Sequence, residues 1–271
     1  MTYKKQNKKL SHTDELKIQL NRLYDYYNHY KFIHPDPLEF LYNYKDRLDQ
    51  EIVGLIASSL AYGKVNQILK NVQKILNILG KRPRLYLMTK SPSEIKKDIL
   101  GFKYRFTTEE DMFSLLIGIR GIIKQYGSLE TGFKSHLNNK KHPKIIYALM
   151  GFCEEIKKAS GNKINFLIPS PSKGSACKRF NLFLRWMVRS DKVDPGCWEG
   201  IPSSILIVPV DTHMFTIAHT LGFTKRKNVD LKTAIEITEK FKYIQPNDPV
   251  KYDFALTRLG IRDEMDIVPF L

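Results

Sequence analysis

The sequence predicts an all-α fold, and three observations lead to this prediction. Apolar side chains recur at steps of three and four in many segments, most clearly between residues 65 and 79, and this is the spacing of one helix face. Glycine or proline follows several of these segments and would end a helix there. No alternating apolar and polar series indicates a sheet, and no internal repeat indicates a solenoid. With 42% hydrophobic residues in 271, the chain can bury a core of its own.

Most of the expected helices have a start or stop signal. The prolines of His34-Pro35-Asp36-Pro37 end the first, Asp49 is expected to cap the third, Gly80 follows the fourth, and Thr108 precedes the acids that begin the sixth. Residues 205–208 should form a short extended segment. We expect helices over residues 14–30, 37–44, 49–61, 65–79, 91–97, 108–126, 129–137, 143–159, 180–188, 213–221, 231–241 and 249–259.

The charge balance favours a polyanionic partner. The chain has 44 Lys and Arg against 28 Asp and Glu, a net charge of +16, and nucleic-acid phosphates are the commonest polyanions in a cytoplasm. A Lys-rich proteome would give the same balance, so the site chemistry has to decide. No long uncharged apolar run predicts a membrane span, and the basic residues 1–12 should form a flexible tail without an export signal. We therefore expect a cytoplasmic protein.

The cysteines argue against a metal or cluster. Cys153, Cys177 and Cys197 lie too far apart for a CxxC zinc site and are too few for an iron–sulfur cluster. No paired histidine and acid spacing suggests another metal site. We expect no metal and no cofactor.

One segment with candidate chemistry places a lysine at the start of a helix. In Gly174-Ser175-Ala176-Cys177-Lys178, small residues run directly into an apolar helix, whose free backbone N–H groups suit a phosphate. The helix dipole and an apolar surrounding would both lower the pKa of Lys178, which would make a neutral nucleophilic amine accessible. The alternative is an exposed lysine that contacts a phosphate or nothing.

The other segment is Pro209-Val210-Asp211-Thr212-His213, 33 residues further on from Lys178. Asp211 precedes a helix, and the commonest role of such a residue is to cap it, a contribution of about 1 kcal/mol. A capping carboxylate also stays ionised, as an anion facing a developing cation must. His213 could hydrogen-bond near Asp211 or to a nucleic-acid backbone, or could simply be packed.

Together the two segments resemble the catalytic core of the helix-hairpin-helix DNA glycosylase superfamily, which includes endonuclease III and the 8-oxoguanine glycosylases. Residues 174–178 resemble its hairpin with a nucleophilic lysine, and residues 208–218 are similar to the segment that carries its catalytic aspartate. The segment 54–59 resembles an early helix of the same superfamily. The three pieces also resemble a bacterial family known only as a domain of unknown function.

The resemblance implies a two-lobed helical fold with a helix-hairpin-helix-like motif and a cleft between the lobes. Residues 45–190 would form a barrel-like lobe with the hairpin and Lys178. Residues 13–44 and 191–271 would form a second lobe that carries Asp211, with an insertion around residues 191–204.

The resemblance also implies a function. A monomer would bind duplex DNA near the nucleoid and flip out a damaged base, which is expected to be an oxidised purine. It would excise this base through a Schiff base on Lys178, assisted by Asp211. Cleavage of the DNA strand would follow. Tyr252, Asp253 and Phe254 fall where the superfamily places base-pocket residues, although core packing is the alternative for them. Leu60 or Tyr62 falls where the residue inserted into the DNA is expected. The residues expected to contact DNA are Lys173, Gly174, Ser175, Arg179, Tyr62 and His213.

Two other classes of protein remain open at this point. Ala176 replaces the second glycine of the hairpin, and an apolar or aromatic residue replaces a polar wedge. Both differences favour a DNA- or RNA-binding protein that uses the same scaffold without cleaving. A helical metal-dependent hydrolase that uses Asp211 and His213 is the less supported possibility.

Overall fold

The fold was analysed in a computed structural model, which describes residues 11–137, 145–161 and 166–261. Within these ranges the elements are helices, with isolated β-bridges and no strand. The all-α prediction is therefore confirmed for the described residues. The 3-10 helices are η1 (Tyr30–Phe32), η2 (Pro37–Asn43), η3 (Pro171–Lys173) and η4 (Ser203–Ile205). The α-helices are α1 (His12–Tyr27), α2 (Arg47–Ser59), α3 (Val65–Leu79), α4 (Pro83–Thr89), α5 (Pro92–Asp98), α6 (Glu109–Tyr126), α7 (Leu129–Leu137), α8 (Ile145–Ala159), α9 (Lys178–Val188), α10 (Thr212–Thr220), α11 (Leu231–Ile244) and α12 (Asp253–Ile261).

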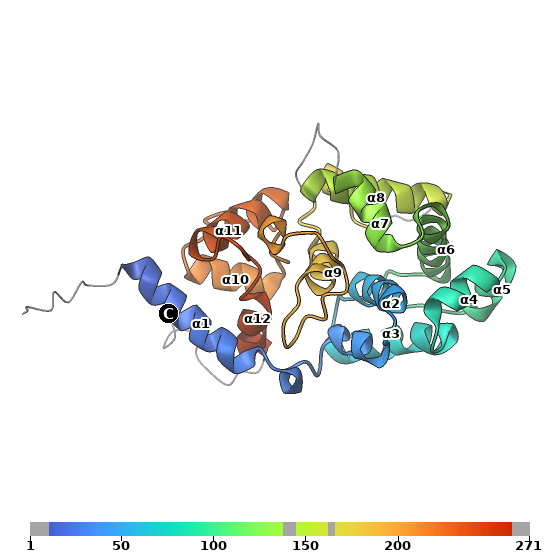
Figure 1. The fold of residues 1–271 in the computed structure, drawn as a ribbon, viewed down its shortest axis with the longest axis horizontal. Coiled ribbons are helices and arrows are strands. Elements are labelled where there is room, and N and C mark those ends of the chain that lie inside the picture. Colours follow the sequence, from blue (N-terminus) through green and yellow to red (C-terminus); the bar gives the residue numbers. More distant parts are fainter. Residues whose placement is uncertain (1–10, 138–144, 162–165, 262–271) are drawn as a thin grey trace, which may run out of the picture.

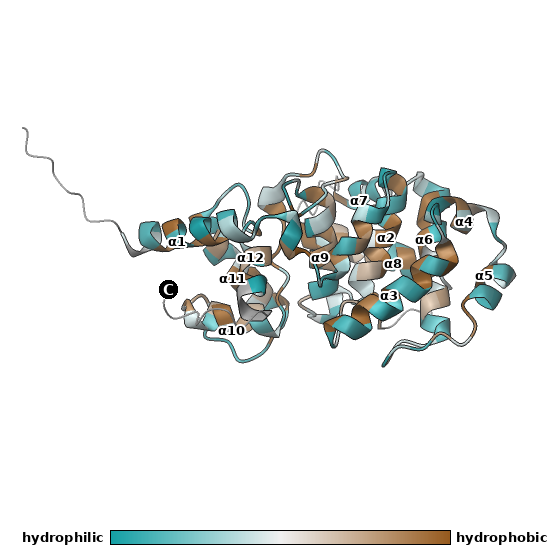
Figure 2. Ribbon diagram, turned by 90° about the horizontal axis from the view of Figure 1, so that it is seen from below, coloured by the Kyte–Doolittle hydropathy of each residue, from teal (hydrophilic) through white to brown (hydrophobic). Residues whose placement is uncertain are grey.

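The helices gather into two groups with α9 between them (Figure 1). In one group α6, α7 and α8 pack together, and α2 packs against α7 and α4. In the other, α1 and α10 pack against α12. The apolar faces turn inward in both groups (Figure 2). Helix α9 packs against α2. The helix that begins with Lys178 therefore contacts the first group and faces the second.

The segment 37–43 lies with the first group. Leu38 and Leu41 of η2 are completely buried, and η2 packs against α2 and α3. The apolar side chains of η2 are thus covered by helices of the first group, and the lobe boundary expected at residue 45 stays a prediction.

Acidic side chains of α2 cap other helices. The helix begins at Arg47 with Asp46 as its N-cap, so the prediction of Asp49 as its cap was wrong. Asp49 instead accepts a hydrogen bond of 2.7 Å from the backbone N–H of Arg84, at the start of α4. Glu51 accepts from the backbone N–H groups of Leu129 and Glu130, at 2.8 and 2.9 Å, at the start of α7. These contacts satisfy N–H groups that a helix leaves free at its start and fix α2 against its neighbours.

No helix in the described part of the chain is long and apolar enough to cross a membrane. Residues 1–10 of the expected tail lie outside the described residues.

Candidate functional site

A cavity of about 300 Å³ lies where the two groups of helices meet at α9. Five segments that are distant in the sequence line it, and both candidate catalytic residues are among them. The walls come from residues 35–37, from the 61–68 segment where α3 begins, from one face of α9, from residues 209–213, and from α12. The lining residues are Pro35, Asp36, Pro37, Ala61, Gly63, Val65, Ile68, Lys178, Leu182, Arg185, Pro209, Asp211, His213, Asp253, Thr257 and Arg258.

Lys178 is the first residue of α9, and its side chain lines the cavity. Cys177, just before it, adopts the left-handed conformation, with φ of 48°, which turns the chain sharply into the helix. The Lys178 Nζ lies 3.7 Å from Asp211 Oδ2 and donates a 3.4 Å hydrogen bond to the carbonyl of Ala61. Its side chain is 33% exposed. The amine is therefore anchored on two sides and still accessible from the cavity.

Asp211 divides its two carboxylate oxygens between structure and site. It is the N-cap of α10, as its position before an apolar segment predicts, and its Oδ1 accepts a 2.8 Å hydrogen bond from the Met214 N–H. Its other oxygen, Oδ2, faces Lys178. His213 is exposed and lines the same cavity. The structure thus brings Lys178, Asp211 and His213 together.

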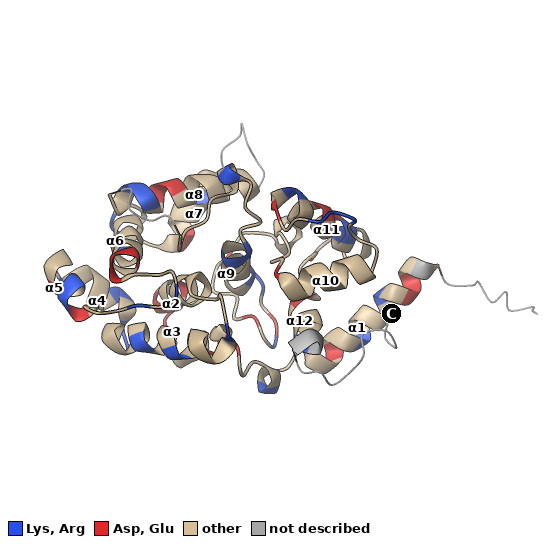
Figure 3. Cartoon of the chain, turned by 180° about the vertical axis from the view of Figure 1, so that it is seen from behind, with Lys and Arg blue, Asp and Glu red and all other residues tan. Residues whose placement is uncertain are grey.

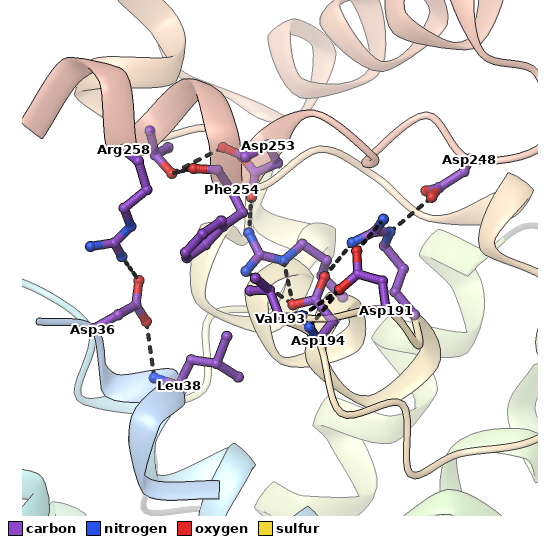
Figure 4. A network of polar contacts seen from close by, with 12 residues as sticks. Asp36, Leu38, Asp191, Val193, Asp194, Asp248, Asp253, Phe254 and Arg258 are labelled. Carbon is purple, nitrogen blue, oxygen red and sulfur yellow. Dashed lines mark hydrogen bonds and ion pairs between the residues drawn. The ribbon is translucent and has the colours of Figure 1, made fainter. Parts of the chain in front are cut away.

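The opposite wall of the cavity is buried and charged. Arg185 lies two turns after Lys178 on α9, so both side chains leave the same face of the helix. Arg185 donates to Asp253 at the start of α12, and Arg258 of the same helix donates to Asp36 (Figure 4). Arg185, Asp253 and Arg258 are each at most 3% exposed.

This wall continues into a larger ionic network behind the cavity. Arg185 and Arg189 both contact Asp194, which is completely buried, and Arg189 also pairs with Asp191 and Asp248 (Figure 4). Burial alone would lower the pKa of Arg185, but the carboxylates around it raise that pKa above its usual value. Burial also raises the pKa of Asp253 to about 6, against the opposing effect of the Arg185 guanidinium. The region around residues 191–204, expected as an insertion, thereby supplies acids that hold α9 in place.

This ionic wall was not predicted, because residues 180–188 were interpreted as an apolar helix. The signal that could have predicted the wall was Arg185, an arginine inside a largely apolar helical segment, since a buried arginine requires carboxylate partners. The partners themselves, Asp194 and Asp253, are 9 and 68 residues away from Arg185, and spacing alone does not identify them.

The expected hairpin lies beside the N-terminus of α11. Lys173 and Gly174 are exposed, and Gly174 has a φ of 74°. The Gly174 carbonyl accepts a 2.9 Å hydrogen bond from the Leu231 N–H, and Ser175 forms a bridge with Asp230. The first turn of α9 has no side-chain cap. The Lys173 side chain is therefore accessible to a ligand, whereas both backbone groups of Gly174 are already hydrogen-bonded and Ser175 is partly covered.

Arg179 and Tyr62 do not line the cavity, and their side chains contact each other. The Arg179 guanidinium donates to the carbonyls of Ser59, at 2.8 Å, and of Phe166, and it lies over the Tyr62 ring at 5.4 Å. Burial lowers the pKa of Arg179 to about 10. The Tyr62 hydroxyl hydrogen-bonds to the Tyr104 carbonyl at 2.9 Å. In this structure Arg179 fastens the end of α2 instead of presenting its guanidinium to a phosphate.

Only one of the three expected base-pocket residues lines the cavity. Asp253 does so, whereas Tyr252 is 1% exposed, and its hydroxyl donates to Asn21 Oδ1 at 2.9 Å. Phe254 is buried beneath the Arg258 guanidinium, 4.8 Å from the ring centre. Successive helical residues point in different directions, so the face of α12 that carries Asp253, Thr257 and Arg258 directs Tyr252 and Phe254 elsewhere.

A protein-family model described as "Protein of unknown function (DUF2400)" matches residues 36–262. No curated protein and no solved structure gives a significant match. Within the described residues, no three His, Cys, Asp or Glu side chains gather where they could hold a metal ion.

Proposed function

This chain belongs to the DUF2400 family of proteins of unknown function, and we propose that it is a DNA N-glycosylase with strand-cleaving lyase activity. One observation carries the proposal. Lys178 and Asp211, which are remote in the sequence, lie 3.7 Å apart and line one cavity. A partly exposed amine next to a carboxylate is the arrangement that covalent catalysis at an electrophilic carbon needs.

The cavity suits one flipped nucleotide. Its volume of about 300 Å³ lies at the small end of the range for ligand sites, roughly 300–1,000 Å³. A nucleotide that enters it would have its sugar near Lys178 and its base towards the wall of Arg185, Asp253 and Arg258. Because this wall is polar and buried, it would favour a base that offers both hydrogen-bond donors and acceptors.

The proposed chemistry balances with these two residues. The proton of the Lys178 ammonium passes to Asp211, and the amine then forms a bond to the sugar C1′ as the C1′–N bond breaks. The base leaves with the electron pair and takes up a proton. Opening of the sugar ring gives an iminium, loss of a C2′ proton follows, and the C3′–O bond breaks with its electron pair on the phosphate. Once Asp211 has passed this proton to the departing base, its carboxylate is ionised again and stabilises the cationic sugar.

The finer architecture belongs to the same proposal. The segment Gly174–Lys178 would act as the phosphate-binding hairpin, and the cavity would be the deepest part of a cleft between two lobes. The uncapped first turn of α9 supports this role, since it leaves backbone N–H groups available to an anion. We propose a monomer that acts on damaged DNA, with an oxidised purine as the expected lesion, in the cytoplasm.

A panel of duplexes, each with one damaged base, tests this function. We expect release of a base and a strand break with the wild-type protein, and a loss of at least about 100-fold in rate with Lys178→Gln, since removal of an activated nucleophile has effects of this order or larger. Asp211→Asn should also lose rate while it keeps the fold, because asparagine caps a helix as well as aspartate does. Lys158→Gln, an exposed lysine outside the cavity, should match the wild type. No base release from any duplex would reject the proposal.

Nucleic-acid binding without cleavage is the second candidate. The contact that favours it is the hydrogen bond from Lys178 Nζ to the Ala61 carbonyl, because an amine held by a carbonyl and a carboxylate can also serve as a structural tie. In that case DNA or RNA would bind with an affinity that falls steeply with salt, without preference for damage. Lys178→Gln would then reduce stability or binding, and wild type and variant alike would leave every duplex intact.

A further inference from the structure

A second hollow, which is strongly basic, lies next to the candidate site. It has a volume of about 470 Å³ and lies between α3 and the turn at residues 103–105. We call it the α3 groove. Its lining includes five cationic side chains and no acid (Figure 3 shows Lys and Arg along α3). The lining residues are Lys64, Gln67, Lys70, Asn71, Lys74, Lys103, Tyr104 and Arg105.

The charges of the α3 groove are not neutralised. Its five cationic residues are all exposed, and none has an ion-pair partner within the part of the chain that the structure describes. Some surface lysines elsewhere differ, since Lys90, Lys96 and Lys134 each pair with a glutamate. Uncompensated cations that share one hollow produce a positive field that attracts an extended anion.

The α3 groove adjoins the cavity of Lys178. Val65 and Ile68 of α3 line that cavity, whereas Lys64, one residue earlier, lines the groove. Gly63 lies between the two hollows. It lines the cavity, and Arg105 of the groove packs so closely on it that a Cβ at Gly63 would stand 2.5 Å from Arg105 Nη1. A polymer with one unit in the cavity can therefore continue into the groove.

The length of the α3 groove matches a run of phosphates. Lys64 and Lys74 are ten residues apart, about 15 Å along the helix, and one strand of a duplex presents roughly four phosphates over this length. Polar Gln67 is exposed between the lysines and can donate to phosphate oxygens, whereas Asn71 is buried and donates to the Gln67 carbonyl. We propose that the α3 groove binds the phosphodiester backbone of the DNA strand on one side of the nucleotide in the cavity.

Arg105 lies in a turn that hydrogen bonds stabilise. The backbone groups of Tyr104 and Thr107 exchange two hydrogen bonds of 2.9 and 2.8 Å, and the Tyr104 hydroxyl donates to the Tyr62 carbonyl. Arg105 itself has a φ of 50°, in the left-handed region that side chains other than glycine seldom adopt. This turn places Arg105 beside Gly63, at the junction of groove and cavity, where the strand would pass.

The strand assignment rests on the proposed function, but the test separates the two. The probe is a labelled duplex with one tetrahydrofuran abasic-site analogue, and binding is measured by fluorescence anisotropy over a range of salt concentrations. The test variant is Lys70→Gln/Lys74→Gln/Lys103→Gln. The control, Lys124→Gln/Lys158→Gln/Lys240→Gln, removes three exposed lysines outside both hollows.

We expect the test variant to bind at least about tenfold more weakly and to lose roughly two to three from the slope of log K against log salt, since each phosphate contact contributes close to one. The control should stay within about twofold of the wild type, because its lysines do not meet the DNA. Equal effects of the two triple substitutions would overturn the assignment.

A set of shortened duplexes locates the contact. Removal of about four base pairs from one side of the analogue should weaken binding by the wild type on that side only, and the test variant should be insensitive to it. If the wild type loses nothing on either side, or the variant loses as much as the wild type, the groove does not bind the strand. If the protein binds the analogue no better than intact DNA, the proposed function fails, while the salt slopes still decide the role of the groove.

Discussion

Two side chains on the same face of α9 form ion pairs with residues at the starts of C-terminal helices, but the surroundings of the two pairs differ. The side chains of Lys178 and Asp211 are 33% and 26% exposed and 3.7 Å apart. Those of Arg185 and Asp253, two turns along, are 2% and 3% exposed, and they continue into a network with Asp194. Water can replace the partner of an exposed charge, whereas a buried charge that loses its partner is left without solvation. We conclude that the buried pair holds the helices together, whereas the exposed pair is accessible, as the proposed chemistry requires.

The largest expected effect comes from breaking the buried pair. Arg185→Ala leaves Asp194 and Asp253 buried without their guanidinium, and we expect the free energy of unfolding to fall by about 3–5 kcal/mol. Urea unfolding followed by the fluorescence of the buried Trp186 and Trp198 measures this. A loss below about 1 kcal/mol would be typical of an exposed pair and would remove the distinction between the two ion pairs.

A smaller effect should appear in the pH dependence of stability. The pKa of Asp253 in the folded protein is about 6, above its ordinary value of 3.8, so the folded chain holds this proton more tightly than the unfolded chain does. The stability that Asp253 contributes is complete below its ordinary pKa and is lost as the pH rises through about 6, by up to about 3 kcal/mol.

Asp253→Asn removes this titration. Unfolding curves of wild type and variant, measured between about pH 4 and pH 7, should therefore converge or cross as the pH rises, since only the wild type loses the contribution. Parallel curves across this interval would show that Asp253 has no raised pKa in the folded protein.

The smallest expected effect on stability belongs to the exposed pair. Lys178→Gln should change the free energy of unfolding by less than about 1 kcal/mol, because partly exposed pairs contribute little. The same urea titration measures this, with Arg185→Ala as the reference. A destabilisation as large as that of Arg185→Ala would make Lys178 a structural residue.

Local patterns were sufficient to predict much of the fold. Residues 65–79 were expected to be helical and form α3 over the same range, because the apolar spacing and Gly80 are signals within the segment. Helix α4 was missed, since it is short and its N-terminus is satisfied by Asp49 from α2, which is distant in the sequence. For the same reason Asp49 was wrongly assigned as the cap of its own helix.

The site was predictable in part. The capping role of Asp211 follows from its place before a helix. Lys178 was expected in the first turn of the apolar helix that follows residues 174–177. The partners of Arg179 and Arg185 depend on which distant segments pack against α9, and local spacing carries no information about that. The α3 groove, in contrast, had a local signal: Lys64, Gln67, Asn71 and Lys74 recur on one face of a predicted helix.

Covalent trapping tests the central claim most directly. The protein is incubated with duplex DNA that carries a natural abasic site, in the presence of borohydride, and the modified residue is located by mass spectrometry of the digested adduct. Our account predicts a stable secondary amine between the sugar C1′ and Nζ of Lys178, which is absent in Lys178→Gln and reduced in Asp211→Asn. An adduct on another residue, or none with the folded wild-type protein, would contradict it.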